Sequence, residues 1–370
     1  MRAIIAAAGT GGHINPGIAI ANKIKEKDNK SEIIFIGTSR GLEKDLVPRA
    51  GYKLITIDAY GISRKITFNN MKNMVKTLNS IRKTKKIIKE FKPDIVIGTG
   101  GYICGPVMLA AKSLKIPTML HESNAFPGIA VKMFSKKVDE VLVGFEDAIK
   151  RIPKAKKIVL TGTPTKIKDL HLPDTERKLI KQNLGFNSNL PLVLVVGGSQ
   201  GAKSINTALI DIIKNKRINY QIMWAAGPSQ YEVIKEELKK YNINIENIKN
   251  VQIVPYIYNM EEVINAVDVV VARSGAMTIT EIAIAGKPAI FIPFPYATEN
   301  HQEYNARVLE KIGAAKIILD KDLTAQTLEQ EINGIISNPE KQVEMGKNAK
   351  KIAIENVEEK IYAEIEKVLQ

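Results

Sequence analysis

The first thirteen residues, Met1 to His13, are MRAIIAAAGTGGH. The apolar run Ala3–Ala8 predicts a buried strand, and the glycines directly after it predict a tight turn. A helical pattern follows near Pro16. Strand, glycine turn and helix in this order form the first part of a βαβ unit, which is typical of a parallel sheet covered by helices.

The same order of strand, turn and helix returns along the chain. We predict strands at 3–8, 33–36, 54–57, 95–97, 118–120, 141–143 and 158–160, then at 192–196, 221–224, 252–254, 269–271, 289–292 and 315–318. A polar helix is expected near 173–183, and helical pattern fills 339–369. A break near Gly162-Thr163-Pro164 divides the strands into two series. The fold class is therefore α/β, with two doubly wound domains.

Composition narrows the class of protein. The chain has 370 residues, which is more than one hydrophobic core usually serves, and 45% of them are hydrophobic, which is ordinary for a globular protein. A single cysteine, Cys104, fits a reducing compartment. We expect no membrane span and no signal peptide, since no uncharged apolar run approaches about 18 residues.

Positive charge is concentrated in one half of the chain. The net charge is +15, with 29 basic and 13 acidic side chains in residues 1–163 and 25 against 26 in residues 164–370. Residues 64–92 alone hold ten basic side chains and one acidic one. This imbalance predicts an anionic partner for the N-terminal half.

Three glycine-rich loops follow predicted strands: 8–13, 98–102 and 197–202. Glycine lets a ligand approach backbone N–H groups, and a helix that starts behind the loop favours phosphate. None of the loops has the G-x-G-x-x-G spacing; in the first loop, Ile14 stands where the last glycine would be. No Gly-Lys-Ser/Thr follows any of the three loops. A nicotinamide enzyme and a P-loop NTPase are therefore disfavoured.

Few side chains in these regions could perform acid–base chemistry. Of the four histidines, His13 closes the first loop, His121 follows a strand, and His301 lies in a polar stretch, whereas His171 is expected to be solvated. Glu122 is a second candidate base. Glu281 either belongs to a capping box with Thr278 or binds the two hydroxyls of a ribose. No spacing indicates a metal site, so we expect none and no cofactor.

Taken in order, these motifs resemble the MurG family of bacterial cell-wall N-acetylglucosaminyltransferases. The resemblance covers essentially the whole chain and rests on GTGGH at 9–13, PD at 93–94 with GTGGY at 98–102, Pro117 with HESN at 121–124, GGSQGA at 197–202, RSGAMTITE at 273–281, HQEYNA at 301–306 and GAA at 313–315.

The resemblance implies a GT-B fold, in which two Rossmann-like domains face each other across a cleft. It implies an N-terminal acceptor-binding domain (1–162), a C-terminal UDP-sugar-binding domain (163–349) and a last helix, about 350–370, that packs back on the first domain. It also implies inverting transfer of N-acetylglucosamine from UDP-N-acetylglucosamine to the 4-hydroxyl of the muramyl sugar of lipid I, which gives lipid II for peptidoglycan synthesis.

Roles for single residues follow from the resemblance and the residue chemistry together. His13 is the preferred general base and Glu122 the alternative. Backbone N–H groups and the Ser199 hydroxyl would stabilise the leaving diphosphate without a metal. The predicted donor-binding set is Thr10, Gly11, Gly12, Asn124, Lys166, Ser199, Gln200, Gly201, Ile257, Ala276, Met277, Thr278, Glu281, Gln302 and Asn305. The predicted acceptor-binding set is Gly9, Gly98, Thr99, Gly100, Gly101 and Tyr102.

Three positions depart from the family pattern. Ala8 stands where the family usually has glycine, Ser123 where it has glutamine, and Thr163-Pro164-Thr165-Lys166 where it has Asn-Pro-x-Arg. Lysine keeps the charge of arginine but not its forked geometry, which puts a donor contact by Lys166 in doubt.

A basic helix is expected to hold the enzyme on the cytoplasmic face of the cell membrane. Five lysines between 65 and 89 share one face of a helix, opposite an apolar stripe at 74, 78, 81 and 88: Lys65, Lys72, Lys76, Lys83 and Lys86. An anionic leaflet and a polyprenyl-pyrophosphate acceptor suit this charge. Other cell-wall proteins are further expected partners. Nucleic acid is not, because aromatic residues are sparse there.

Three other functions remain as alternatives: a transferase with another lipid acceptor such as diacylglycerol, a sugar-nucleotide epimerase of the same fold, and a basic RNA- or membrane-binding scaffold.

Overall fold

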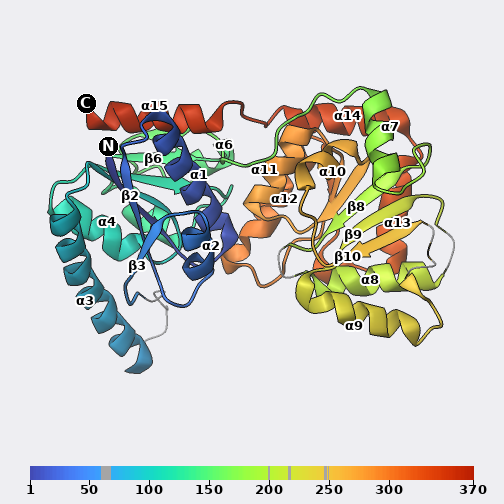
Figure 1. Cartoon of the computed structure of the whole chain (residues 1–370), viewed down its shortest axis with the longest axis horizontal. Helices are drawn as coiled ribbons and strands as arrows, with labels where there is room; N and C mark the ends of the chain where they lie inside the picture. The colour runs from blue at the N-terminus through green and yellow to red at the C-terminus, as the bar shows by residue number, and fades with distance from the viewer. Residues whose placement is uncertain (60–67, 199–200, 216–217, 246–247, 249) are drawn as a thin grey trace. The chain divides into compact units, whose positions relative to one another are not determined.

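The computed structural model describes residues 1–59, 68–198, 201–215, 218–245, 248 and 250–370, without the side chains of 68–75 and 78 (Figure 1). It divides the chain into two compact units. Unit 1 comprises Met1–Thr165 and Ile354–Gln370, and unit 2 comprises Lys166–Ala353. The predicted donor residues Ser199 and Gln200 lie outside the described residues, as does the side chain of Lys72.

Unit 1 is built on a seven-stranded sheet with the order β3-β2-β1-β4-β5-β6-β7. All paired strands are parallel. The strands are β1 (Arg2–Ala7), β2 (Glu32–Gly37), β3 (Lys53–Thr56), β4 (Ile95–Gly100), β5 (Thr118–Glu122), β6 (Glu140–Val143) and β7 (Ile158–Leu160). The seven predicted strands of this half are confirmed. Apolar runs mark these strands because both faces of a covered parallel sheet need apolar side chains.

Helices cover both faces of this sheet. They are α1 (Gly11–Lys27), α2 (Glu43–Arg49), α3 (Phe68–Phe91), α4 (Cys104–Ser113), α5 (Ile129–Phe134), α6 (Glu146–Ile149) and α15 (Val357–Leu369). One core cluster takes side chains from α1 and α15, and another takes them from α3, α4 and α5. α1 starts directly on the glycine loop rather than near Pro16, which lies inside the helix.

Unit 2 is built on a six-stranded parallel sheet with the order β10-β9-β8-β11-β12-β13. Its strands are β8 (Leu192–Val196), β9 (Gln221–Ala225), β10 (Val251–Val254), β11 (Val269–Ala272), β12 (Ala289–Phe291) and β13 (Ala315–Ile317), as predicted. The helices around it are α7 (Asp174–Asn183), α8 (Lys203–Lys214), α9 (Pro228–Lys239), α10 (Met260–Ala266), α11 (Ala276–Ala285), α12 (His301–Lys311), α13 (Ala325–Ile336) and α14 (Pro339–Lys350), with short 3-10 turns η2 (Thr298–Asn300) and η3 (Asp320–Asp322).

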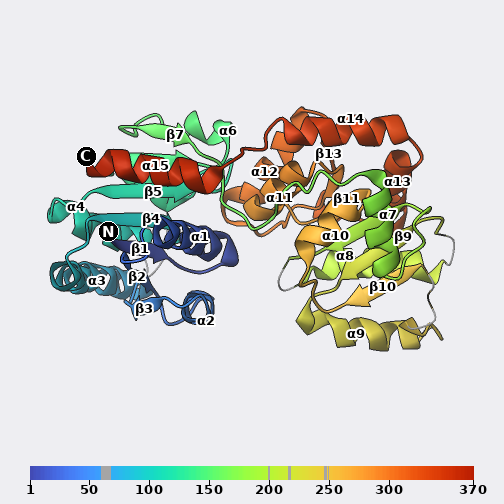
Figure 2. The ribbon, with the colours of Figure 1, turned by 45° about the horizontal axis from the view of Figure 1, so that its top comes forward.

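The C-terminal helical pattern consists of two helices, and the second begins at Val357 rather than at about 350. α14 ends at Lys350 in unit 2, and α15 begins after Asn356, whose φ of +54° breaks the helix. α15 lies beside α1 in unit 1 (Figure 2), where Glu359 accepts hydrogen bonds from Lys23 and Lys27. Ile361 and Ile365 bury their side chains in the core there.

Both sheets have a point at which the strand order reverses. In unit 1 it lies between β1 and β4, and in unit 2 between β8 and β11. The connections on the two sides of such a point turn away from each other, which leaves a crevice at the carboxyl ends of the strands. The first and third predicted glycine loops follow β1 and β8, and the second begins inside the end of β4, at Gly98, so all of them lie at these two points.

Candidate functional site

The first two glycine loops touch at the switch point of unit 1. Gly9, Gly100 and Gly101 have φ angles of +99°, +131° and +83°, a region that L side chains rarely adopt. A Cβ on Gly101 would lie 2.5 Å from the carbonyl oxygen of Ala8. Glycine is therefore required for these two loops to pack against each other.

His13 is held in one orientation by its neighbours. Its Nδ1 lies 3.0 Å from the carbonyl oxygen of Ala8. A carbonyl can only accept, so Nδ1 carries the hydrogen, and in the neutral ring Nε2 presents a lone pair. The ring packs on Gly100, where a Cβ would come within 2.2 Å of His13 Cδ2. Thr99, which is buried, donates its hydroxyl to the backbone carbonyl of His13 at 2.8 Å.

Glu43, on α2, is a residue of this site that the sequence did not reveal. Its side chain is 0% exposed and accepts hydrogen bonds from the Gly9 N–H at 3.0 Å, the Thr38 N–H at 2.9 Å and the Thr38 hydroxyl at 2.6 Å. Burial alone would raise the pKa of Glu43, but these hydrogen bonds outweigh it and hold the pKa below its usual range. Gly37 and Gly41 leave the space that the side chain fills.

Glu122 and Asn124 form a turn at the end of β5. Oε1 of Glu122 accepts hydrogen bonds from the backbone and side-chain N–H groups of Asn124, both at 2.9 Å, and Oε2 accepts from the Gly128 N–H at 2.7 Å. Glu122 is 5% exposed. Both oxygens of this alternative base are thus engaged in holding the turn.

His121 has a structural role and not a catalytic one. It is fully buried, Nε2 lies 3.0 Å from the carbonyl oxygen of Gly162, and Nδ1 lies 3.4 Å from the Ser123 hydroxyl. Burial lowers the pKa of His121 to about 4, so the ring is neutral and ties β5 to the end of unit 1.

The third glycine loop lies at the switch point of unit 2. Gly198 and Gly201 have φ angles of +87° and +75°, and a Cβ on Gly201 would lie 2.2 Å from the Ala226 carbonyl oxygen. α8 begins at Lys203, directly behind the loop. Unpaired backbone N–H groups at the start of a helix suit an anion.

Across the switch point, the start of α11 is cross-linked to its neighbours. Arg273 donates to Asp320 and to the Ser204 hydroxyl on α8. Ser274 donates its hydroxyl to the Gln302 carbonyl, and Asn305, which is buried, donates to the Ser274 carbonyl at 3.2 Å. These bonds fix the N-terminus of α11 beside the third loop.

Four of the other predicted donor residues of unit 2 lie on α11. Met277, Thr278 and Glu281 are partly buried on this helix, and Ala276 and Ile257 are buried. α11 begins at Ala276 with Gly275 as its N-cap, so Thr278 and Glu281 do not form a capping box. The side-chain oxygen of Gln302 accepts from the Phe294 N–H, Lys166 is exposed, and His301 lies at the start of α12 against the Thr298 carbonyl.

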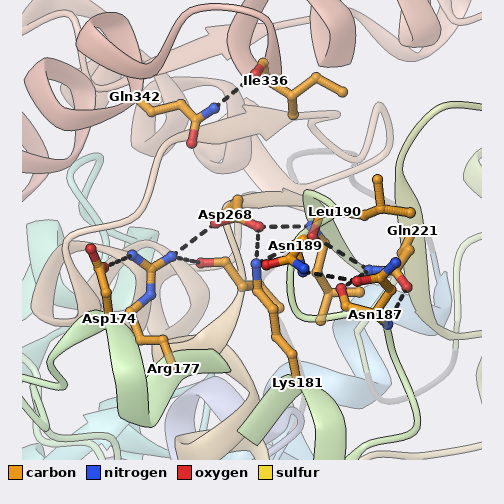
Figure 3. Close-up of polar contacts among 12 residues, drawn as sticks. Asp174, Arg177, Lys181, Asn187, Asn189, Leu190, Gln221, Asp268, Ile336 and Gln342 are labelled. Atoms are coloured by element: carbon orange, nitrogen blue, oxygen red, sulfur yellow. Dashed lines mark hydrogen bonds and ion pairs between the residues drawn. The ribbon is translucent and has the colours of Figure 1, made fainter. Parts of the chain in front are cut away.

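A separate polar cluster lies at the N-terminal ends of the strands of the same sheet (Figure 3). Asp268, which precedes β11, accepts hydrogen bonds from Arg177 at 2.9 Å, Lys181 at 2.6 Å and the N–H of Leu192 at 2.7 Å. Because Leu192 opens β8, this cluster is a strand length away from the third glycine loop, and it serves to attach α7 to the sheet.

Among the described residues, no group of three His, Cys, Asp or Glu side chains is placed to hold a metal ion. Within the same residues, no helix combines the length and the apolar character that crossing a membrane requires.

Two parallel α/β units, each with glycine loops at its switch point, have the architecture of the GT-B fold. The chain belongs to glycosyltransferase family 28: the model of the family's N-terminal domain matches residues 3–143, and that of its C-terminal domain matches residues 192–361.

Full-length relatives make the family relationship more specific. A UDP-N-acetylglucosamine–N-acetylmuramyl-(pentapeptide) pyrophosphoryl-undecaprenol N-acetylglucosamine transferase of Caldanaerobacter subterraneus is 44% identical over 98% of both chains. A protein of the same name from Acetivibrio thermocellus is 42% identical over 100% of this chain and 99% of its own. The crystal structure of Acinetobacter baumannii MurG has a TM-score of 0.79 at 28% identity, over 99% of each chain.

A UDP-GlcNAc 2-epimerase from Neisseria meningitidis has a TM-score of 0.65 at 16% identity, over 99% of this chain and all of its own. That likeness shows a common fold and no more.

Proposed function

We propose that the chain transfers N-acetylglucosamine from UDP-N-acetylglucosamine to the 4-hydroxyl of the muramyl sugar of lipid I, forming lipid II with inversion at the anomeric carbon. The observation that carries this proposal is that glycine loops occupy the switch points of both sheets, in a chain 44% identical to transferases of that name along its full length. Unit 1 would bind the acceptor and unit 2 the UDP-sugar.

His13 is the general base in this proposal. The attacking hydroxyl must lose its proton, and the lone pair on Nε2 can take it because the Ala8 carbonyl holds the hydrogen on Nδ1. Glu122 has both oxygens occupied by N–H donors, which favours a role in shaping the turn.

The leaving UDP is stabilised by backbone N–H groups in this proposal. The third glycine loop and the start of α8 supply fixed donors where negative charge develops. A metal is then unnecessary, and treatment with EDTA should leave turnover unchanged. A rate that depends on added Mg²⁺ would contradict this part of the proposal.

Unit 1 would contact the membrane, on its cytoplasmic face. Lys76, Lys83 and Lys86 lie on α3, and the side chain of Lys86 is 80% exposed. The Lys83 ammonium donates to the Thr56 carbonyl, so part of its stem lies along the unit.

The function is tested with purified protein, UDP-N-acetylglucosamine and a short-chain lipid I analogue. We expect lipid II and UDP as products. Activity only on diacylglycerol, or epimerisation of the donor without any acceptor, would replace the proposed reaction by one of those two.

The base is tested with two variants in the same assay. His13→Gln should lower kcat by about a hundredfold with the KM for the donor little changed, while Glu122→Gln should cost less than about tenfold. The reverse order of effects would assign the base to Glu122.

A further inference from the structure

The peptide group between Ala8 and Gly9 is held at both ends. Its N–H, on Gly9, donates to Oε2 of Glu43 at 3.0 Å, and its C=O, on Ala8, accepts from Nδ1 of His13 at 3.0 Å. No cis peptide bond occurs in the described chain, so these two groups point in opposite directions from one rigid plane. The orientation of the carbonyl that His13 uses is therefore set by whatever binds the N–H.

We propose that Glu43 is a positioning residue, which fixes the Ala8–Gly9 peptide plane and thereby keeps the hydrogen of His13 on Nδ1. This inference deepens the proposed function, because His13 is the general base there.

Glu43 suits this task because its carboxylate has no hydrogen to donate. All three groups around it, the Gly9 N–H and the N–H and hydroxyl of Thr38, are donors. α2 carries the carboxylate, and Thr38 clamps it from the end of β2. The Leu42 N–H also donates to the Gly9 carbonyl at 3.3 Å, so α2 holds both sides of Gly9.

Gly9 makes this anchor necessary. At a φ of +99°, with no atom within 4 Å of a hypothetical Cβ, Gly9 offers little steric resistance to rotation of the peptide plane. If the plane turned, Nδ1 of His13 would lose its acceptor. An imidazole exposed to water then carries its hydrogen largely on Nε2, where it cannot accept the proton of the substrate.

The test uses Glu43→Gln, which keeps the shape of the side chain but directs an amide N–H₂ or a single carbonyl at three donors. Imidazole ¹⁵N spectra report the tautomer, with the His13 signal assigned by its loss in His13→Gln. We expect the Nδ1–H tautomer in the wild type and a shift towards Nε2–H in Glu43→Gln. We also expect kcat to fall by about tenfold, with the KM for UDP-N-acetylglucosamine within about twofold.

Asp139→Asn is the matched control. Asp139 accepts from the N–H and hydroxyl of Thr118 as Glu43 does from those of Thr38, but at the other end of the sheet, where β5 begins. Asp139→Asn should lower the melting temperature without moving the His13 tautomer.

A measurement on the wild type covers the case in which Glu43→Gln does not fold. The Gly9 amide should be strongly protected from hydrogen exchange, because it is bonded to a buried carboxylate. Exchange at the rate of an open loop, or an unchanged tautomer in a folded Glu43→Gln protein, would overturn the proposal. Neither readout requires turnover, so a tautomer that shifts in a protein without lipid I activity would refute only the proposed function.

Discussion

Gly100 is the residue on which the ring of His13 rests. In Gly100→Ala the new methyl group would lie 2.2 Å from His13 Cδ2, at a φ of +131°. We expect the ring to be displaced and kcat to fall by tenfold or more, with about 1–3 kcal/mol of stability lost to backbone strain. Steady-state kinetics and urea unfolding measure the two effects.

Gly51→Ala is the control for strain alone. Gly51 has a φ of +84°, and nothing lies within 4 Å of its hypothetical Cβ. Its stability should fall by a similar amount while kcat stays close to that of the wild type. Equal losses of kcat in both variants would show that Gly100 does not act through His13.

A second prediction concerns Lys287, which is buried near the charges of Arg177, Lys181 and Asp268. Its side-chain nitrogen donates to the carbonyls of Asn265 at 2.6 Å and Val267 at 3.0 Å. Burial, together with the nearby charge of Arg177, lowers the pKa of Lys287 from 10.5 to about 7. The neutral amine has two N–H groups, which match the two carbonyls.

The sign of the pH effect follows from this lowered pKa. Between pH 7 and 10.5 the unfolded chain binds a proton at Lys287 that the folded protein has released, so this residue makes the protein more stable as pH rises. From pH 7 to 9 the wild type should gain about 2 kcal/mol relative to Lys287→Met, measured by urea unfolding. Lys178→Met, at an exposed position of α7, should show no such change. A difference independent of pH would refute the prediction.

At the scale of single residues, the sequence indicates those whose role depends on near neighbours in the chain. The glycines and His13 are evident because they directly follow an apolar strand. Glu43 and the engagement of Glu122 are not evident, because their partners are brought to them only by folding. The sequence shows only that glycines stand at positions 37 and 41, shortly before Glu43.

At the scale of elements, α15 is attached to unit 1 by a shared cation. Lys157, on the segment before β7, donates to Glu140 at 2.8 Å and to Glu364 of α15 at 2.6 Å. Glu140 is 1% exposed, and burial raises its pKa. Lys157 thus lies between two carboxylates that would otherwise repel each other.

Removing this cation should loosen the helix. We expect Lys157→Met to lower the free energy of unfolding by about 1–3 kcal/mol and to increase hydrogen exchange in α15. The loss is limited because the lysine is only half-buried. Lys156→Met breaks a pair with Asp139 at 3.5 Å and should cost less than about 1 kcal/mol. Equal losses in the two variants would show that Lys157 does not anchor α15.

Strands were easier to predict than helix ends. All thirteen predicted strands occur, because continuous apolar runs bounded by turns leave few alternatives in an α/β protein. The start of the last helix was less well predicted: it was expected at about 350 and begins at Val357, because asparagine also occurs inside helices and the left-handed backbone of Asn356 is not evident from the sequence. The packed face of α3 also includes Ser80 and Thr84, which periodicity of apolar residues cannot reveal.

At the scale of the whole molecule, the charge belongs to units rather than to halves of the sequence. Unit 1 has 31 basic and 18 acidic side chains, a net of +13, and unit 2 has 23 and 21, a net of +2. Residues 354–370 carry five acidic and two basic side chains, so the return of α15 to unit 1 lowers the surplus there. Unit 1 still holds most of the positive charge.

This distribution predicts which unit binds vesicles. Changing Lys76, Lys83 and Lys86 of α3 to Glu should weaken co-sedimentation with phosphatidylglycerol vesicles by at least tenfold, because each lysine contributes on the order of 1 kcal/mol. The same change in net charge at Lys235, Lys239 and Lys240, at the end of α9 in unit 2, should have a smaller effect. Equal weakening would show that binding depends on net charge and not on α3.

The discontinuity of unit 1 has a consequence for how the protein is made. Unit 2 is complete in sequence once Ala353 has been added, whereas the core of unit 1 still lacks Val357, Ile361 and Ile365. A ribosome synthesises the chain from the N-terminus, so the unit that is started first is finished last. Until residues 354–370 have left the ribosome, the face of the seven-stranded sheet that α15 covers stays exposed to solvent and accessible to chaperones.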